Sequence, residues 1–195
     1  LWHGAPTVVL RDVDPAAILE AIATHRVTNL LLVPAVIQLL LDTPAVADCD
    51  FSHLRVLVYG ASPISDDVLV RGMERFGAVF AQVYGMTETT GSITQLDGTD
   101  HVPGRLRSCA TPYPWVALRV VDGDGADAAP GTVGELRTRS EQTMPGCRNN
   151  PDAPSATLHA DSSPMPPHPS PASPAHYPSP PHHPHALTRP GSTYS

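Results

Sequence analysis

The segment Tyr84-Gly85-Met86-Thr87-Glu88 places an aromatic ring, a hydroxyl and a carboxylate next to one another in the chain. These groups suit a nucleotide, because a ring can stack on a base, a hydroxyl can bond a phosphate oxygen, and a carboxylate can hold Mg²⁺. A structural interpretation is also open, in which Thr87 and Glu88 begin a helix and Tyr84 is half-buried core. The residue types alone favour that structural interpretation, because short motifs often match by chance.

A second candidate segment, Gly60-Ala61-Ser62-Pro63, follows an apolar run that ends at Tyr59. Glycine in each segment would let a ligand approach the backbone closely. In a parallel α/β sheet, ligands collect at the carboxyl ends of the strands. We therefore expect Gly60 and Gly85 to lie at the same edge of one sheet.

The elements that would position these segments alternate along the first part of the chain. Asp14 followed by Pro15 predicts a helix start, and Ser65 with Asp66 and Asp67 predicts another. The apolar patterns predict strands at 7–10, 29–33, 54–59 and 78–83, and helices at 15–25, 34–41 and 65–77. Strands that alternate with helices indicate an α/β fold, here a partial parallel sheet with flanking helices.

The pattern changes after about residue 97. Two further strands are expected at 116–121 and 133–139, separated by the hairpin-type turn Asp122–Gly125. We therefore divide the chain into an α/β part at 1–97, a β-rich continuation of the same domain at 98–150, and a Pro/His/Ser-rich tail at 151–195. The tail has almost no apolar periodicity, which predicts disorder, and its histidines have no fixed spacing for a metal.

Composition narrows the possible partners. The net charge is −7, which argues against nucleic acid, and no apolar run approaches the length of a membrane span. Three widely spaced cysteines suggest reduced thiols and a cytoplasmic location. All 12 basic residues other than histidine are arginine, so a phosphate site here would have no lysine. The start at Leu1 rather than methionine is consistent with a fragment.

The segment 84–88 resembles the signature of the adenylate-forming (AMP-binding) superfamily, and Met86 favours its acyl-CoA synthetase or fatty-acid–CoA ligase members. The resemblance continues elsewhere in the expected order. Val27–Pro34 resembles the strand before the acyl pocket, Leu57–Pro63 the adenine-side loop, and Gly134–Gly146 the next core motif. It covers about residues 1–161.

This resemblance implies catalytic and metal-binding roles for two residues. Thr87 would bond the α-phosphate, where attack by a carboxylate creates the acyl-adenylate. Glu88 would coordinate Mg²⁺ and so neutralise phosphate charge. For Glu135 and Arg139, an ion pair or a solvated strand face is as good an interpretation as a role in the site.

The remaining implied contacts are with adenine and the acyl group. Tyr84 would stack on adenine, with the backbone of Gly60, Ala61 and Ser62 on its other side. Gly85 and Met86 would face the acyl group. ATP, Mg²⁺ and coenzyme A are the implied cofactors, and a small carboxylic acid is the implied partner.

The sequence also departs from this family. The lysine-bearing phosphate loop, the ribose-binding aspartate and the late catalytic lysine are absent, and Ala110 stands where glycine is usual. We therefore predict an internal fragment of an acid–thiol ligase of fatty acid metabolism, with an aberrant C-terminal tail, inactive by itself. The alternative is a non-catalytic interaction protein with a vestigial nucleotide-binding layer and a Pro-rich tail.

Overall fold

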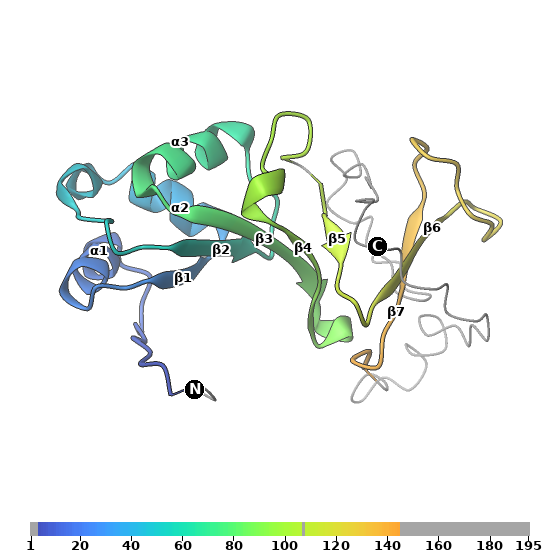
Figure 1. Ribbon diagram of the computed structural model, residues 1–195, viewed down its shortest axis with the longest axis horizontal. Helices are drawn as coiled ribbons and strands as arrows, with labels where there is room; N and C mark the ends of the chain where they lie inside the picture. Colours follow the sequence, from blue (N-terminus) through green and yellow to red (C-terminus); the bar gives the residue numbers. More distant parts are fainter. Residues whose placement is uncertain (1–3, 107, 145–195) are drawn as a thin grey trace. The chain divides into compact units, whose positions relative to one another are not determined.

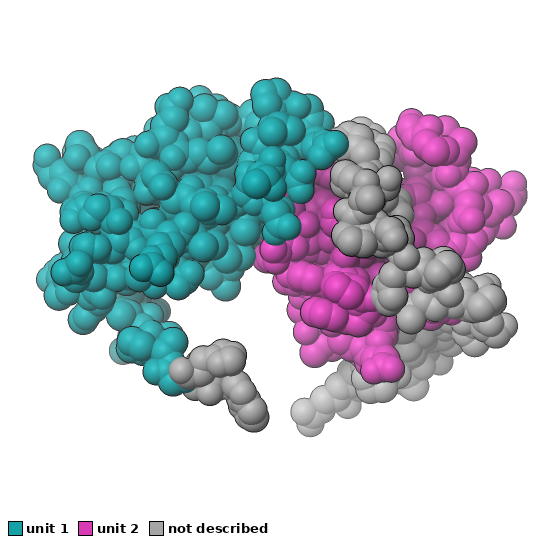
Figure 2. Space-filling model, viewed as in Figure 1, with its two compact units in different colours: residues 1–82, 97–107 teal, residues 83–96, 108–195 magenta. Residues whose placement is uncertain are grey.

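The computed structural model describes residues 4–106 and 108–144. The described residues form two compact units, which are residues 4–82 with 97–106 and residues 83–96 with 108–144 (Figure 2). Strand β3 (Val79–Met86) begins in the first unit and ends in the second. The predicted disordered tail from Pro151 lies outside the described residues.

Helices and strands alternate in the first unit, as predicted (Figure 1). Strands β1 and β2 run parallel, with Leu30 opposite Leu57. In chain order, the elements before β3 are α1 (Pro15–Thr24), β1 (Asn29–Leu32), α2 (Pro34–Leu41), the 3-10 helix η1 (Pro44–Asp48), β2 (Val56–Gly60) and α3 (Asp66–Phe76). A further 3-10 helix, η3 (Gly98–Asp100), follows later in the chain.

The helix ends form where the sequence predicts them. The Asp14 carboxylate accepts a hydrogen bond from the Ala16 N–H at 3.0 Å and caps α1, which begins at Pro15. The Ser65 hydroxyl caps α3 by accepting from the Val68 N–H at 3.3 Å. Gly77 ends α3 with a φ of 59°, a left-handed conformation that costs glycine little.

Apolar burial holds the first unit together. The core cluster includes Ile37 and Leu40 from α2, Leu57 and Tyr59 from β2, and Leu69 from α3. Burial of such side chains is the main favourable term in folding. The parallel register places Leu31 and Val58 on the other face, and Leu31 is 70% exposed. The helices therefore cover one face of this part of the sheet.

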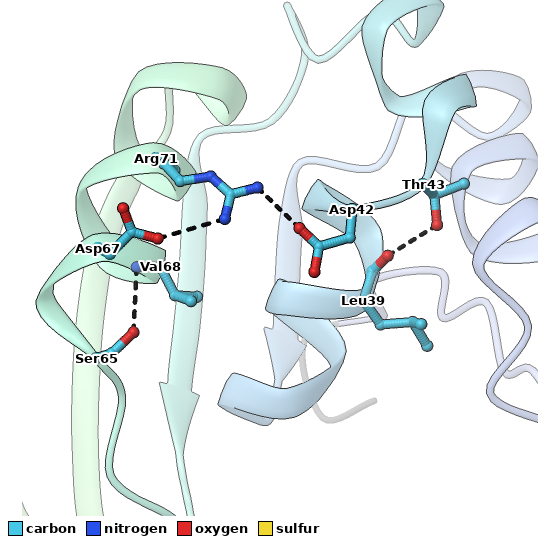
Figure 3. A network of polar contacts seen from close by, with 7 residues as sticks. All are labelled: Leu39, Asp42, Thr43, Ser65, Asp67, Val68 and Arg71. Carbon is cyan, nitrogen blue, oxygen red and sulfur yellow. Dashed lines mark hydrogen bonds and ion pairs between the residues drawn. The ribbon is translucent and has the colours of Figure 1, made fainter.

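An exposed arginine links α2 to α3 (Figure 3). The Arg71 guanidinium donates to the Asp42 carboxylate at 2.9 Å and to the Asp67 carboxylate at 3.4 Å. Beside it, the Thr43 hydroxyl donates to the Leu39 carbonyl at 2.8 Å at the end of α2. Because these ion pairs are in contact with water, they add little to the stability of the fold.

The strand predicted at 7–10 is wrong. Residues Thr7 to Leu10 have no regular structure, and Val9 is 83% exposed. Thr7, Val8 and Val9 are β-branched, which raises β propensity, but a strand also requires a hydrogen-bonded neighbour. Among the described residues, the sheet order begins at β1 and includes no strand formed by this segment.

The second unit contains the two strands predicted beyond residue 97. Its elements are the end of β3, the 3-10 helix η2 (Thr87–Thr89), β4 (Gly91–Leu96), β5 (Thr111–Pro112), β6 (Ala117–Val121) and β7 (Glu135–Arg139). The larger sheet has the order β1-β2-β3-β4-β5, with β4 and β5 antiparallel. Strands β6 and β7 form a separate antiparallel pair, which confirms the smaller β-rich part.

The turn predicted after β6 forms, but it does not join β6 directly to β7. The Gly125 N–H donates to the Asp122 carbonyl at 3.1 Å, which closes the turn. The chain then returns only as far as a bridge between Val121 and Asp127, and β7 begins later, at Glu135. Within residues 4–106 and 108–144, no helix has the length and apolar character required to span a membrane.

Candidate functional site

Strand β3 continues through Met86, three residues beyond its predicted end at Val83. Tyr84, Gly85 and Met86 are therefore strand residues rather than loop residues, which corrects the prediction. The reason is a tight pairing with the next strand. A side chain at Gly85 would come within 2.1 Å of the Gly91 carbonyl oxygen, so only glycine fits between the two backbones.

The turn after β3 is organised by the Thr89 side chain. Its hydroxyl accepts from the Met86 N–H at 3.1 Å and lies 3.0 Å from the Met86 carbonyl and 2.7 Å from the Gly91 carbonyl. A hydroxyl has one hydrogen, so it donates to one of these carbonyls at a time. Thr89 is only 1% exposed, so this side chain forms the centre of the turn.

The side chains of Thr87 and Glu88 take no part in the bonds that hold the turn. Thr87 is exposed, Glu88 is 9% exposed, and neither side chain has a hydrogen bond or ion pair with another residue that the structure describes. A largely buried carboxylate without a cation is costly unless a partner or metal binds it. Hard oxygen ligands of this kind suit Mg²⁺, so these residues fit the metal that the resemblance implies.

Tyr84 has features of both interpretations of the sequence, as a half-buried core residue and as a ring that contacts a ligand. The residue is half-buried, and its hydroxyl is buried with no hydrogen-bond partner among the described residues. Burial raises the pKa of the phenol, and the nearby Cys109 thiol adds to this effect. The hydroxyl therefore stays protonated, and the remaining accessible part of the residue is available for contact with a ligand.

Three residues far along the chain hold this turn, and sequence analysis missed their role. The Gln142 amide donates to the Thr89 carbonyl at 2.8 Å and to the Ser92 carbonyl at 3.0 Å, and it accepts from the Trp115 indole at 3.1 Å. The Met144 N–H donates to the Glu88 carbonyl at 2.8 Å. Backbone carbonyls occur at every residue, so no pattern of residue types marks these partners.

Gly60, Ala61 and Ser62 lie in the first unit, at the end of β2. Gly60 is buried, whereas Ala61 and Ser62 are exposed, and Ala61 has a left-handed φ of 68°. Their expected place beside the adenine bound by Tyr84 stays a prediction, as does the common sheet edge for Gly60 and Gly85.

A buried polar pair anchors the end of β2. The Tyr59 hydroxyl lies 3.0 Å from Nε2 of His101, and Nδ1 of His101 lies 2.9 Å from the Asp97 carbonyl. Because a carbonyl only accepts, Nδ1 carries the proton and Nε2 accepts from Tyr59. Burial is the main cause that lowers the pKa of His101, so the neutral ring is favoured.

Two further sequence interpretations can be compared with the structure. Glu135 accepts from Arg137 of the same strand at 3.1 Å, which agrees with the ion-pair interpretation for Glu135. Ala110, at a position where glycine is usual in the family that the sequence resembles, has a φ of 76°. This conformation is the one that favours glycine, so the substitution carries backbone strain.

Comparison with known proteins identifies the family. Residues 1–147 match the family described as AMP-binding enzyme. The chain is 37% identical over 155 residues to the medium/long-chain fatty-acid–CoA ligase FadD8 of Mycobacterium tuberculosis, covering 80% of this chain and 27% of that protein. It is 34% identical over 157 residues to the fatty acid–[acyl-carrier-protein] ligase ScoC of Streptomyces coeruleorubidus, covering 80% of this chain and 30% of that protein.

A solved structure of similar fold agrees with the family match. The amide bond synthetase McbA from Marinactinospora thermotolerans superimposes with a TM-score of 0.72 at 34% identity, over 77% of this chain and 31% of McbA. The chain thus spans less than a third of the length of these relatives. The family match over residues 1–147 covers most of the chain, which therefore belongs to the AMP-binding enzyme family.

Proposed function

We propose that this chain is part of an ATP-dependent acyl-CoA synthetase that activates a fatty or other carboxylic acid. The carboxylate oxygen attacks the α-phosphorus of ATP, the bond to the β-phosphate breaks, and pyrophosphate leaves. The thiol of coenzyme A then attacks the acyl carbon of the acyl-adenylate and displaces AMP. The names of the relatives support this assignment, since they include ligases of fatty acids to CoA and to a carrier protein. ATP and CoA both occur in the cytoplasm, where we place the reaction.

The observation that carries the proposal is the turn at Thr87 and Glu88. It presents an exposed hydroxyl beside a largely buried carboxylate, and neither side chain has a partner among the described residues. Thr87 would bond the α-phosphate, and Glu88 would hold the metal. Mg²⁺, when bound there, would neutralise phosphate charge as pyrophosphate leaves.

The other site residues would bind the two ends of the intermediate. Tyr84 would stack on adenine, with Gly60, Ala61 and Ser62 on the opposite side of the base. Gly85 and Met86 would lie near the acyl group. Tight pairing already explains why residue 85 is glycine, so its contact with the acyl group is an additional proposal.

We further propose that the chain alone does not form an acyl-adenylate. Displacement of pyrophosphate requires compensation of the triphosphate charge and in-line geometry. The sequence offers arginine but no lysine for this purpose. Loss of one preorganised electrostatic donor typically costs about 10²–10³ in rate.

Two measurements test these proposals separately. The affinity for ATP is measured in Mg²⁺ and in EDTA. The wild type should bind ATP more tightly in Mg²⁺, and Glu88→Gln should lose this magnesium-dependent gain in affinity. Exchange of labelled pyrophosphate into ATP, with short, medium and long fatty acids, should not exceed that of Glu88→Ala. Absence of the magnesium-dependent gain in the wild type would contradict the site, whereas exchange above the Glu88→Ala control would contradict the inactivity.

A further inference from the structure

We propose that Gln142 is a positioning residue for the turn at Thr87 and Glu88. It holds the backbone so that the Thr87 hydroxyl and the Glu88 carboxylate face a magnesium-bound nucleoside triphosphate together. This inference rests on the proposed function, because it concerns the same metal and phosphate site.

Both N–H hydrogens and the oxygen of the Gln142 amide have hydrogen-bond partners within one unit. Both N–H donors are used, to the carbonyls of Thr89 at 2.8 Å and Ser92 at 3.0 Å. Its oxygen accepts from the Trp115 indole at 3.1 Å. Since an indole only donates and a carbonyl only accepts, these three partners allow a single orientation of the amide.

The two carbonyls flank the strained part of the turn. Thr90 has a φ of 52° and Gly91 a φ of 122°, both in regions that residues with side chains rarely adopt. For a β-branched residue such as Thr90, a left-handed conformation is sterically unfavourable. A clamp on the residues immediately before and after this pair therefore opposes relaxation of the turn.

Gln142 is itself fixed by local bonds. Its N–H donates to the Ser140 hydroxyl at 3.3 Å, and the Thr143 N–H donates to the Ser140 carbonyl at 3.1 Å. The Met144 N–H, bonded to the Glu88 carbonyl at 2.8 Å, adds a contact that does not depend on any side chain. The 140–144 segment is thus a rigid base for the clamp.

This arrangement has a direct consequence for Glu88. No side chain among residues 4–106 and 108–144 bonds its carboxylate, so no side-chain partner orients it and the backbone of the turn sets where the side chain begins. Partners that orient a metal ligand without touching the metal typically change metal affinity by about 10–100-fold when they are removed. Gln142 has this role through the backbone.

The test compares variants at Gln142 with a matched glutamine in the same unit. Gln142→Glu keeps the size and the acceptor for Trp115 but loses both donors, and Gln142→Leu controls for the added charge. The matched control is Gln95→Glu on β4, because the Gln95 side chain accepts from the Tyr113 hydroxyl at 3.0 Å and the same change of an amide to a carboxylate can be made there. For each variant, the dissociation constant of ATP is measured in Mg²⁺ and in EDTA.

In both Gln142 variants, the magnesium-dependent gain in ATP affinity should be about 10-fold smaller than in the wild type. The affinity in EDTA should not change. Gln95→Glu should behave as wild type in both conditions. The Thr90 amide, which donates to the Thr87 carbonyl at 3.0 Å, should also exchange its hydrogen faster in Gln142→Leu. In the double variant with Glu88→Gln, Gln142→Leu should cause no further loss, because it acts through Glu88. A global loss of folding would instead weaken binding in EDTA as well.

Retention of the magnesium-dependent gain in both Gln142 variants would overturn the proposal and leave the proposed function intact. Additive losses in the double variant would also overturn it, because Gln142 would then act independently of Glu88. If the wild type has no magnesium-dependent gain, the proposed function fails and the positioning role fails with it. Faster exchange of the Thr90 amide would in that case show a purely structural clamp.

Discussion

At the scale of single residues, the turn after β3 has the buried Thr89 hydroxyl at its centre, and the Gln142 amide bonds to its backbone. The side chains of Thr87 and Glu88 have no partners among the described residues. The residue types at Tyr84, Thr87 and Glu88 alone favoured a structural interpretation, and only the resemblance to the family favoured a nucleotide site, which stays a prediction. Thr89 and Gln142 escaped prediction because they bond mainly to backbone groups, which every residue supplies. The half-buried position of Tyr84 agrees with the structural interpretation and still permits contact with a base.

Backbone strain at two alanines gives a prediction about stability. Ala61 and Ala110 have φ values of 68° and 76°, where a methyl group costs about 1–2 kcal/mol. Glycine removes this strain but loses about 0.4–1 kcal/mol through the greater freedom of the unfolded chain. Ala61→Gly should therefore raise the free energy of unfolding by up to about 1 kcal/mol in urea titrations.

Ala110→Gly is the internal comparison for that prediction. Ala110 is 5% exposed, so its substitution also loses burial of a methyl group, and the gain should be smaller than at Ala61. A decrease in stability for Ala61→Gly would show that strain does not dominate at this position.

The buried His101 predicts sensitivity to acid. Because burial lowers its pKa in the folded state, the unfolded chain takes up a proton at higher pH, near its ordinary value of about 6.5. Stability should therefore decrease as the pH falls through about 6.5, by at most about 1.4 kcal/mol per pH unit for one proton. Chemical denaturation between pH 8 and pH 5.5 measures this slope.

The contribution of His101 is isolated by comparing variants. His101→Gln should be less stable at pH 8, since it disturbs the bond to Tyr59, but its stability should decrease less on acidification. His25→Gln is the control, because His25 is exposed at the end of α1. An identical pH slope in wild type and His101→Gln would rule out His101 as the cause.

At the scale of elements, local signals located the helices well and the strand ends poorly. Asp14 and Ser65 cap their helices as predicted, because a cap depends on neighbouring residues. The failed strand at 7–10 and the extension of β3 to Met86 depend on which strand lies alongside, and a local pattern does not contain that information. Strand β4 follows the turn and was not predicted for the same reason.

The close approach of β3 and β4 makes Gly85 a sensitive position. In Gly85→Ala the added Cβ would lie 2.1 Å from the Gly91 carbonyl oxygen and 2.6 Å from the Ser92 Cα, and both neighbours are backbone atoms. Such overpacking typically costs about 1–3 kcal/mol. Thermal unfolding should show this loss.

The matched control for Gly85→Ala is Gly123→Ala. Gly123 has no atom within 4 Å of an added Cβ, so its substitution should leave stability nearly unchanged. Equal melting temperatures for Gly85→Ala and wild type would mean that β4 can shift to accommodate a methyl group, and that the tight pairing is not required.

At the scale of the whole molecule, the described residues form two compact units, and Tyr84 to Glu88 lie in the second. The fold class and family could be predicted from the sequence, because motifs in the expected order extend along most of the chain and the family matches residues 1–147. The common sheet edge expected for Gly60 and Gly85 stays a prediction. The chain spans less than a third of the length of FadD8, ScoC and McbA, so its activity alone stays a proposal.

The central claim is that the segment from Tyr84 to Glu88 binds an adenine nucleotide. The most direct test is titration of ATP, in the presence of Mg²⁺, against wild type, Tyr84→Phe and Tyr84→Ala that have been shown to be folded by circular dichroism. Tyr84→Phe removes a hydroxyl that has no partner among the described residues and keeps the ring, so it should bind as wild type. Tyr84→Ala should lose about 1–3 kcal/mol of stacking, or roughly 5- to 150-fold in affinity. Equal affinity of wild type and Tyr84→Ala would contradict the claim.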